Sequence, residues 1–151
     1  MLIQRLLDNK KYYLDLLLLG DEQEDMIDRY LERGEMFTLS VDGNVVAICV
    51  VTDEENGICE LKNIAVRPES QRKGLGTQLL QYISEEYSEN FHTLLVGTGD
   101  SPFTVLFYKN NGFTESHKEE NFFTNNYHEP IFEDGVQLVD MIYLKKDLNR
   151  V

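Results

Sequence analysis

Two glycines and two cations lie together in a short turn between two apolar segments of this sequence. The turn, Arg72-Lys73-Gly74-Leu75-Gly76, follows the strand-like run 60–66 and precedes an apolar run with helical spacing. A helix that begins here presents unpaired backbone N–H groups and the positive end of its dipole, which together attract a phosphate. The glycines let the anion approach because they carry no Cβ atom. We predict that a pyrophosphate binds the amides of Gln71, Arg72, Lys73, Gly74, Leu75, Gly76 and Thr77.

A series of antiparallel strands is expected to position this turn. Asp42-Gly43-Asn44 and Asn56-Gly57 are typical of hairpin turns. Gly20 and Gly34 are expected to end two short helices. The expected elements are strands at 1–7, 36–41, 45–52 and 58–66, and helices at 10–19 and 21–33.

After the turn, the pattern predicts a helix and a second, parallel strand. Apolar residues recur at helical spacing from Leu75 through about Asn90, and 93–97 is a short apolar strand. A strand, a crossover helix and another strand form a right-handed unit with parallel strands. A helix at 101–110 and strands at 113–117 and 136–144 are expected to follow. The prediction is a single α+β domain over residues 1–151, with a mixed, mostly antiparallel sheet and helices on both faces.

The composition argues against several classes of partner. The 151 residues include 27 acidic and 14 basic side chains, a formal net charge of −13. The electrostatic field of this negative charge repels nucleic acids and anionic membranes, so we expect neither as a partner. It attracts cationic acceptors such as amines, although an acidic surface also serves solubility alone. The histidines show no metal-site spacing, so no metal is expected. Cys49 and Cys59 are expected to be reduced thiols in a cytoplasmic protein, because no secretion signal is evident.

A second motif lies about thirty residues after the turn, and the two motifs together indicate a protein family. Gln71-x-x-Gly74-x-Gly76 together with Phe107-Tyr108-Lys109-Asn110-Asn111-Gly112-Phe113 resembles the GNAT superfamily of acyl-CoA-dependent N-acetyltransferases. The likeness is closer to small bacterial members that share three segments, here 62–66, 96–99 and 140–142. The resemblance implies a sheet of about six to seven strands, flanked by about four helices, whose fourth and fifth strands splay apart.

The resemblance also implies a reaction and the residues that carry it. The reaction is acetyl transfer from acetyl-CoA to a small-molecule or peptide amine, by direct attack in a ternary complex. The unpaired main chain of Ile64, Ala65 and Val66 would hold the pantetheine arm like an added strand and supply an oxyanion donor. Tyr108 would protonate the leaving thiolate, since a phenol of pKa about 10 keeps its proton at neutral pH. Alternatively, Tyr108 only packs beside Phe107 and Phe113.

Glu60 is the candidate general base. It lies eleven residues before Gln71, where some histone-type members of the family carry a catalytic glutamate. Strand alternation places Glu60 and Lys62 on one face, opposite Leu61 and Asn63, unless a bulge intervenes. Lys62 would then lower the pKa of Glu60 and weaken it as a base. The alternative is that solvent takes the proton from the amine.

The remaining assignments concern the pantetheine and the acceptor. Many relatives carry Asn where this chain has Asp100, and a carboxylate cannot donate, so Ser101 is the expected substitute in binding the pantetheine. Alternatively, Asp100 acts only as a helix cap. The acceptor pocket is expected between residues 17–26 and 121–134. Its candidate lining residues are Phe122, Phe123, Tyr127, His128 and Phe132, with Glu129 and Glu133 to attract an ammonium group. Alternatively this segment is a core lid or a homodimer face, and the whole protein a non-catalytic acyl-CoA-binding or interaction module.

Overall fold

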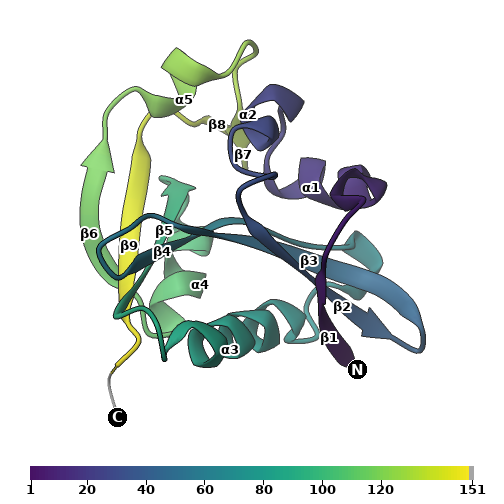
Figure 1. The fold of residues 1–151 in the computed structure, drawn as a ribbon. Helices are drawn as coiled ribbons and strands as arrows, with labels where there is room; N and C mark the ends of the chain where they lie inside the picture. The colour runs from purple at the N-terminus through teal and green to yellow at the C-terminus, as the bar shows by residue number, and fades with distance from the viewer. Residues whose placement is uncertain (150–151) are drawn as a thin grey trace.

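The centre of the molecule is a seven-stranded sheet with helices on both faces (Figure 1). The computed structural model describes residues 1–149. The strands of this sheet are β1 (Leu2–Leu6), β2 (Glu35–Val41), β3 (Asn44–Asp53), β4 (Ile58–Val66), β5 (Thr93–Gly99), β6 (Thr114–Glu119) and β9 (Met141–Asp147). The helices are α1 (Leu14–Gly20), α2 (Glu24–Asp28), α3 (Leu75–Tyr87), α4 (Pro102–Asn110) and α5 (Phe122–Asn126), with 3-10 turns η1 (Lys10–Tyr13) and η2 (Pro68–Ser70). A small hairpin joins β7 (Phe132–Glu133) to β8 (Val136–Gln137).

The strand order is β1-β2-β3-β4-β5-β9-β6, and within residues 1–149 only β4 and β5 run parallel. Helix α3 connects these two strands, so the predicted crossover unit is confirmed. Their pairing is short: it joins Ile58–Leu61 to Thr93–Val96 and then stops, although both strands continue. The α+β class, the mixed sheet and the splay of the fourth and fifth strands are therefore confirmed.

Two hydrophobic clusters lie on opposite faces of the sheet. One packs α3 and α4 against the sheet and includes Leu79, Ile83 and Tyr108. The other packs α1 and α2 against the opposite face, with Leu17 and Ile27 fully buried. Figure 1 shows the sheet between these two layers, with α5 and the β7–β8 hairpin beside α2. The two layers pack against β4 and β5, and the space between these two strands stays open at the end where their pairing stops.

The second helix is shorter than its sequence pattern predicts. It covers Glu24–Asp28 rather than 21–33, and the chain then forms turns as far as Gly34. The Lys10 ammonium donates to the carbonyls of Leu31 at 2.9 Å and Gly34 at 2.7 Å, which attaches these turns to η1. A Cβ on Gly34 would lie 2.7 Å from Val50 Cγ1, which shows how closely the chain approaches the sheet here.

The last strand also differs from its prediction, because it begins at Met141 rather than 136. Residues Val136–Gln137 pair with Phe132–Glu133 in the small hairpin instead. Leu138 then packs into the cavity wall, and its amide donates to the Ile131 carbonyl at 2.8 Å. This detour brings Leu138 against the end of β5, where a Cβ on Gly99 would lie 2.6 Å from Leu138 Cδ1.

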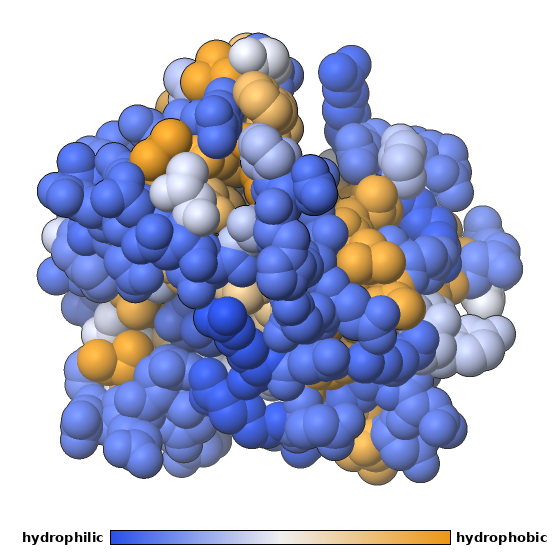
Figure 2. Space-filling view, turned by 90° about the horizontal axis from the view of Figure 1, so that it is seen from above, coloured by the Kyte–Doolittle hydropathy of each residue, from blue (hydrophilic) through white to orange (hydrophobic). Residues whose placement is uncertain are grey.

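The surface is largely hydrophilic. In the view from above, hydrophilic side chains cover most of the face and hydrophobic patches lie apart from one another between them (Figure 2). Within residues 1–149, no helix has both the length and the apolar composition that crossing a membrane requires.

Candidate active site

A cavity of about 790 Å³ lies where β4 and β5 separate. Ile64, Ala65 and Val66 line one side of it. The other predicted residues that line it are Gln71, Arg72, Gly74, Leu75, Gly76, Thr77 and Tyr108. Lys73 and Ser101 do not line this cavity, and Glu60 lines a smaller neighbour instead. The structure thus brings the predicted phosphate turn, the splayed strand and the tyrosine to one space.

A β-bulge in β4 decides which side chains face this space. Val50 pairs with Asn63 and Val51 with Leu61, so Lys62 is an extra residue in the strand. The bulge is the exception that the predicted alternation allowed for, and it places Asn63 on the face of the sheet opposite Leu61. There the Asn63 amide donates to the Leu17 carbonyl at 2.9 Å and to the Tyr30 hydroxyl at 3.1 Å. These bonds attach the splayed half of β4 to the α1–α2 layer.

Helix α3 begins at the cavity with unpaired amides. Gly74 is its N-cap at φ 79°, a left-handed conformation that favours glycine, and no side chain caps the helix. Within the described chain, the amides of Leu75, Gly76 and Thr77 donate to no protein acceptor, and the first turn carries no acidic residue. An anion fits such a helix start. Gln71 instead braces the turn, since its side chain donates to the Val66 carbonyl at 2.9 Å.

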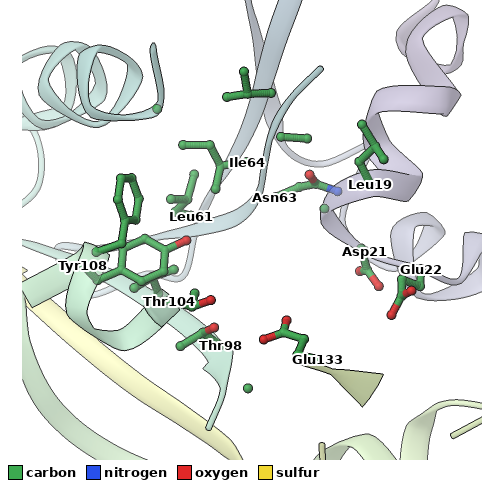
Figure 3. Close-up of a pocket in the computed structure, with 18 of the residues that line it drawn as sticks. Leu19, Asp21, Glu22, Leu61, Asn63, Ile64, Thr98, Thr104, Tyr108 and Glu133 are labelled. Atoms are coloured by element: carbon green, nitrogen blue, oxygen red, sulfur yellow. The ribbon is translucent and has the colours of Figure 1, made fainter. Parts of the chain in front are cut away.

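Tyr108 lies on α4 with its ring in the core and its hydroxyl directed into the cavity (Figure 3). Its ring centroid is 5.2 Å from that of Phe107 and 5.5 Å from that of Phe113, both in edge contact. The hydroxyl makes no hydrogen bond to any residue among 1–149. Burial and the nearby charge of Glu133 raise the pKa of Tyr108 above its ordinary value. The phenol is therefore protonated at neutral pH, and its hydroxyl is free to donate to a ligand.

Glu60 lies on the other side of the bulge, in a second cavity of about 150 Å³. It is 7% exposed, and its Oε2 is 3.0 Å from Lys62 Nζ. Burial raises the pKa of Glu60 and outweighs the lowering by Lys62, so the carboxylate is a stronger base than the Lys62 contact alone would leave it. The two cavities share the lining residues Asp21, Leu61, Lys62, Gly97, Tyr127 and Met141. Glu60 thus lies beside the main cavity rather than in it.

Comparison with known proteins identifies this arrangement. Residues 32–115 match the family model of the acetyltransferase (GNAT) domain. The uncharacterized N-acetyltransferase YvbK of Bacillus subtilis (strain 168) is 38% identical over 136 residues, which cover 89% of this chain and 88% of the relative. The chain belongs to the GNAT acetyltransferases.

Solved structures of other GNAT proteins agree with this family and fold. A GNAT family acetyltransferase from Elizabethkingia anophelis, solved with acetyl-CoA bound, has a TM-score of 0.91 and 33% identity over 97% of both chains. A Bacillus subtilis acetyltransferase in complex with CoA has a TM-score of 0.89 and 34% identity, covering 96% of this chain and 97% of its own. The predicted family is confirmed, and acetyl-CoA is the ligand expected for such a relative. Within residues 1–149, no group of His, Cys, Asp and Glu side chains could hold a metal ion.

The predicted acceptor region of this GNAT protein forms a wall of the main cavity, but not all of the predicted residues line it. Phe123, Tyr127, Phe132 and Glu133 line the main cavity, and Phe122 lines the smaller one. His128 and Glu129 line neither cavity. His128 is instead at the surface, where its Nε2 lies 3.0 Å from Asp25 Oδ2. From the helical side, Asp21 and Glu22 complete the wall.

Sequence reasoning missed several polar members of the site. Thr98 on β5 and Thr104 on α4 line the cavity near Tyr108 (Figure 3). Thr98 is the polar residue between Gly97 and Gly99, a pattern that signals a strand face close to other groups. A Cβ on Gly97 would lie 2.5 Å from Met141 Sδ, which explains the glycine there. Asp100 is exposed and Ser101 is buried outside the cavity, so neither reaches this space directly.

Proposed function

We propose that this protein transfers the acetyl group of acetyl-CoA to an amine by direct attack within a ternary complex. The observation that carries the proposal is the single cavity that joins the splayed strand, the open start of α3 and the Tyr108 hydroxyl. Membership of the GNAT family supports the donor, because a relative with 33% identity was solved with acetyl-CoA bound. The acceptor is a small-molecule or peptide amine.

The residues of the cavity fit the donor in two places. Beyond Leu61, β4 pairs with β3 on one side only, so main-chain groups of 62–66 on the other side are open to an extended ligand. The unpaired amides of 75–77 and the positive end of α3 suit a diphosphate. Arg72 lines the same end of the cavity and adds a cation. Bound acetyl-CoA supplies a thioester: the amine forms the N–C bond at its carbonyl carbon, and the C–S bond then breaks as the oxyanion collapses.

The reaction needs two proton transfers: Tyr108 protonates the leaving thiolate, and Glu60 accepts a proton from the amine. Tyr108 holds a proton at a hydroxyl that points into the cavity and has no protein partner, and this proton stabilises the leaving thiolate. Glu60 receives the amine proton from the adjacent main cavity; the two cavities share a border, since Lys62 and Asp21 line both of them. An amide of 64–66 supplies the oxyanion donor. The runner-up for the base is water, since the small cavity is adjacent to the reacting space rather than part of it.

The test is thiol release from acetyl-CoA by the purified protein with polyamines, amino sugars and peptides as acceptors. Thiol release that depends on both the acceptor and the protein is the expected result. Absence of turnover with every acceptor, combined with intact CoA binding in calorimetry, would instead identify a non-catalytic acyl-CoA-binding module. Absence of CoA binding at millimolar concentration would overturn both readings.

A further inference from the structure

Residues 120–140 form a flap over both cavities. The flap leaves the sheet after β6 and returns at β9, and its two ends lie side by side because Glu119 pairs with Met141. Phe122 and Tyr127 line the smaller cavity. The flap residues that line the main cavity are Phe123, Tyr127, Ile131, Phe132, Glu133 and Leu138. Figure 1 shows the two parts of the flap, α5 and the β7–β8 hairpin, beside α2.

The flap contributes little to the hydrophobic core. Within 120–140, Leu138 alone is buried, at 5% exposed, and no residue of this range belongs to either hydrophobic cluster. A hydrogen bond from the Asn121 amide to Asp140 Oδ1, at 2.8 Å, joins the two ends of the flap. Segments with few buried apolar contacts open at the lowest free-energy cost in a folded protein. The flap can therefore open without unpairing the strands of the sheet.

Polar contacts with the chain between α1 and α2 hold the flap in place. The Tyr127 hydroxyl donates to Asp21 Oδ1 at 2.6 Å, and both residues line both cavities. The Gln23 side chain accepts from the His128 amide at 2.8 Å and donates to the Asn126 carbonyl at 3.2 Å. Of these three bonds, the one to Asp21 has a charged acceptor, and such bonds are stronger than bonds between neutral groups.

Two further contacts join the flap to α2 at the surface. His128 Nε2 lies 3.0 Å from Asp25 Oδ2, and Arg29 donates to the Asn126 side chain at 3.1 Å. The side chains of His128 and Asp25 are 77% and 58% exposed, and exposed pairs contribute little to stability. The partly buried bond to the Asp21 carboxylate is therefore the main attachment of the flap to the α1–α2 layer.

Asp21 is itself fixed in position. Its amide donates to the Leu17 carbonyl at 2.9 Å, at the end of α1. Its Oδ2 accepts from the Tyr30 hydroxyl at 3.0 Å, and that hydroxyl accepts from the Asn63 amide at 3.1 Å. Burial and the Asp21 carboxylate raise the pKa of Tyr30 and Tyr127, so both phenols keep the protons that they donate. Asp21 thus connects the flap to β4, and Figure 3 shows Asp21 and Asn63 on the α1 side of the cavity.

We propose that Asp21 is a positioning residue, which accepts the Tyr127 hydrogen bond and thereby latches the flap closed once the acceptor amine has entered. This inference rests on the proposed acetyl transfer. Acetyl-CoA is assigned to the start of α3 and the open edge of β4, so opening of the flap concerns the acceptor. A closed flap excludes water and holds the amine beside the thioester. Asp21 acts through Tyr127 and the flap rather than on the reacting atoms.

Amide exchange of the flap tests the latch without any acceptor. Hydrogen–deuterium exchange of the CoA-bound protein is followed by mass spectrometry in peptides from 120–140 and from β2 and β3. Tyr127→Phe removes one oxygen and with it the latch, so exchange of the flap amides should become about tenfold faster. Asp21→Asn should act in the same direction. Exchange in β2 and β3 should not change, because these strands pair with each other and with β1 and β4 only.

Kinetics then connect the latch to the reaction. Thiol release from acetyl-CoA is measured with the best acceptor among the polyamines, amino sugars and peptides. In Tyr127→Phe and Asp21→Asn, KM for this acceptor should rise about tenfold, because the apparent affinity falls with the fraction of molecules in the closed state. We expect kcat to stay within about threefold and the Kd of CoA within about twofold. The double variant should be no worse than Asp21→Asn, because both substitutions break the same hydrogen bond.

Asp28→Asn is the matched control. Asp28 is an exposed carboxylate on α2 that pairs with Lys11 at 2.7 Å and lines neither cavity. Among the described residues it makes no hydrogen bond to the flap. Because an exposed ion pair contributes little, Asp28→Asn should leave flap exchange and the acceptor KM within about twofold.

The outcomes separate the latch from the proposed function. Unchanged flap exchange in both Tyr127→Phe and Asp21→Asn would overturn the latch, whereas acetyl transfer would stand if thiol release persisted. Exchange that rises equally in β2 and β3 would also overturn it, because the carboxylate would then serve folding alone. Faster flap exchange with an unchanged acceptor KM would overturn the role in acceptor binding. Faster exchange confined to 120–140, without thiol release from any acceptor, would support the latch and overturn the proposed function.

Discussion

Tyr108→Phe is the substitution that most directly tests the catalytic assignment, because it removes one oxygen and little else. The ring lies in the core, 5% exposed, in edge contact with Phe107 and Phe113. A phenylalanine ring keeps these contacts. The lost hydroxyl has no hydrogen-bond partner within residues 1–149, and a typical partner would contribute only about 1 kcal/mol to stability. We therefore expect the free energy of unfolding to change by less than about 1 kcal/mol.

The effect on activity should be far larger. A positioned general acid contributes roughly 10²- to 10⁴-fold to the rate, so kcat should fall by about that factor while the affinity for CoA stays the same. Burial raises the pKa of Tyr108, so the phenol remains protonated throughout an assay between pH 6 and about 10. The pH dependence of kcat in the unmodified protein should therefore show no loss of activity from ionisation of Tyr108 in this range.

Thiol release, calorimetry with CoA and thermal unfolding of the same preparation measure the three quantities. Tyr82→Phe is the matched control, since Tyr82 is a partly buried tyrosine on α3 that lines neither cavity. It should leave kcat within about twofold. If Tyr108→Phe kept full activity, the hydroxyl would have no catalytic role and the residue would serve packing alone. A fall in CoA affinity equal to the fall in kcat/KM would equally contradict a role confined to the leaving thiolate.

Three further substitutions probe the rest of the site. Glu60→Gln should lower kcat about ten- to hundredfold and remove the acidic limb of the pH profile. Burial raises the pKa of Glu60, so in the unmodified protein activity should be lost as the pH falls through a pKa above the ordinary glutamate value, and an unchanged profile in the variant would assign the proton to water. Gly76→Val should weaken CoA binding at least about tenfold in calorimetry, because the added side chain would occupy the phosphate end of the cavity. Its Cβ meets only the Phe107 ring, at 3.3 Å, and equal CoA affinity in the variant would show that the phosphate turn is not part of the site. Gly20→Ala should lower the free energy of unfolding by about 1–3 kcal/mol in a urea titration, because its Cβ would lie 2.0 Å from Asn63 Oδ1, and an unchanged midpoint would contradict that close approach.

Local signals in the sequence were sufficient to predict the order of the elements as far as β6, whereas α5 and the β7–β8 hairpin were not predicted. Gly43 and Gly57 have positive φ angles at the two predicted hairpin turns, and Gly74 has one where α3 begins. These are positions where glycine relieves a specific backbone constraint, so the residue type itself carries the information. The helical spacing of 75–87 likewise reflects one buried face of α3. The splay of β4 from β5 had no such signal, and its prediction came from the likeness to a family.

Features set by distant contacts could not be predicted in this way. The second helix gives way to turns after Asp28, and the Leu31 and Gly34 carbonyls of these turns accept hydrogen bonds from the Lys10 ammonium, more than twenty residues away in the chain. Glu133 reaches the cavity and Glu129 does not, because residues 132–133 pair with 136–137 in a hairpin that the alternation of 136–144 conceals. In both places, tertiary contacts override a local pattern that favours a longer element.

The bulge at Lys62 gives a physical reason for the splay on which the site depends. An extra residue in one strand increases the local twist of that strand. Here the register of β4 against β3 shifts between Leu61 and Asn63, and the parallel pairing of β4 with β5 ends at Leu61. The strand therefore turns away from β5 at the residue where the bulge begins, and Asn63 fastens the diverging half to Leu17 and Tyr30 of the α1–α2 layer. One inserted residue thus separates a paired half of β4, which carries Glu60, from an open half, which lines the cavity opposite Tyr108.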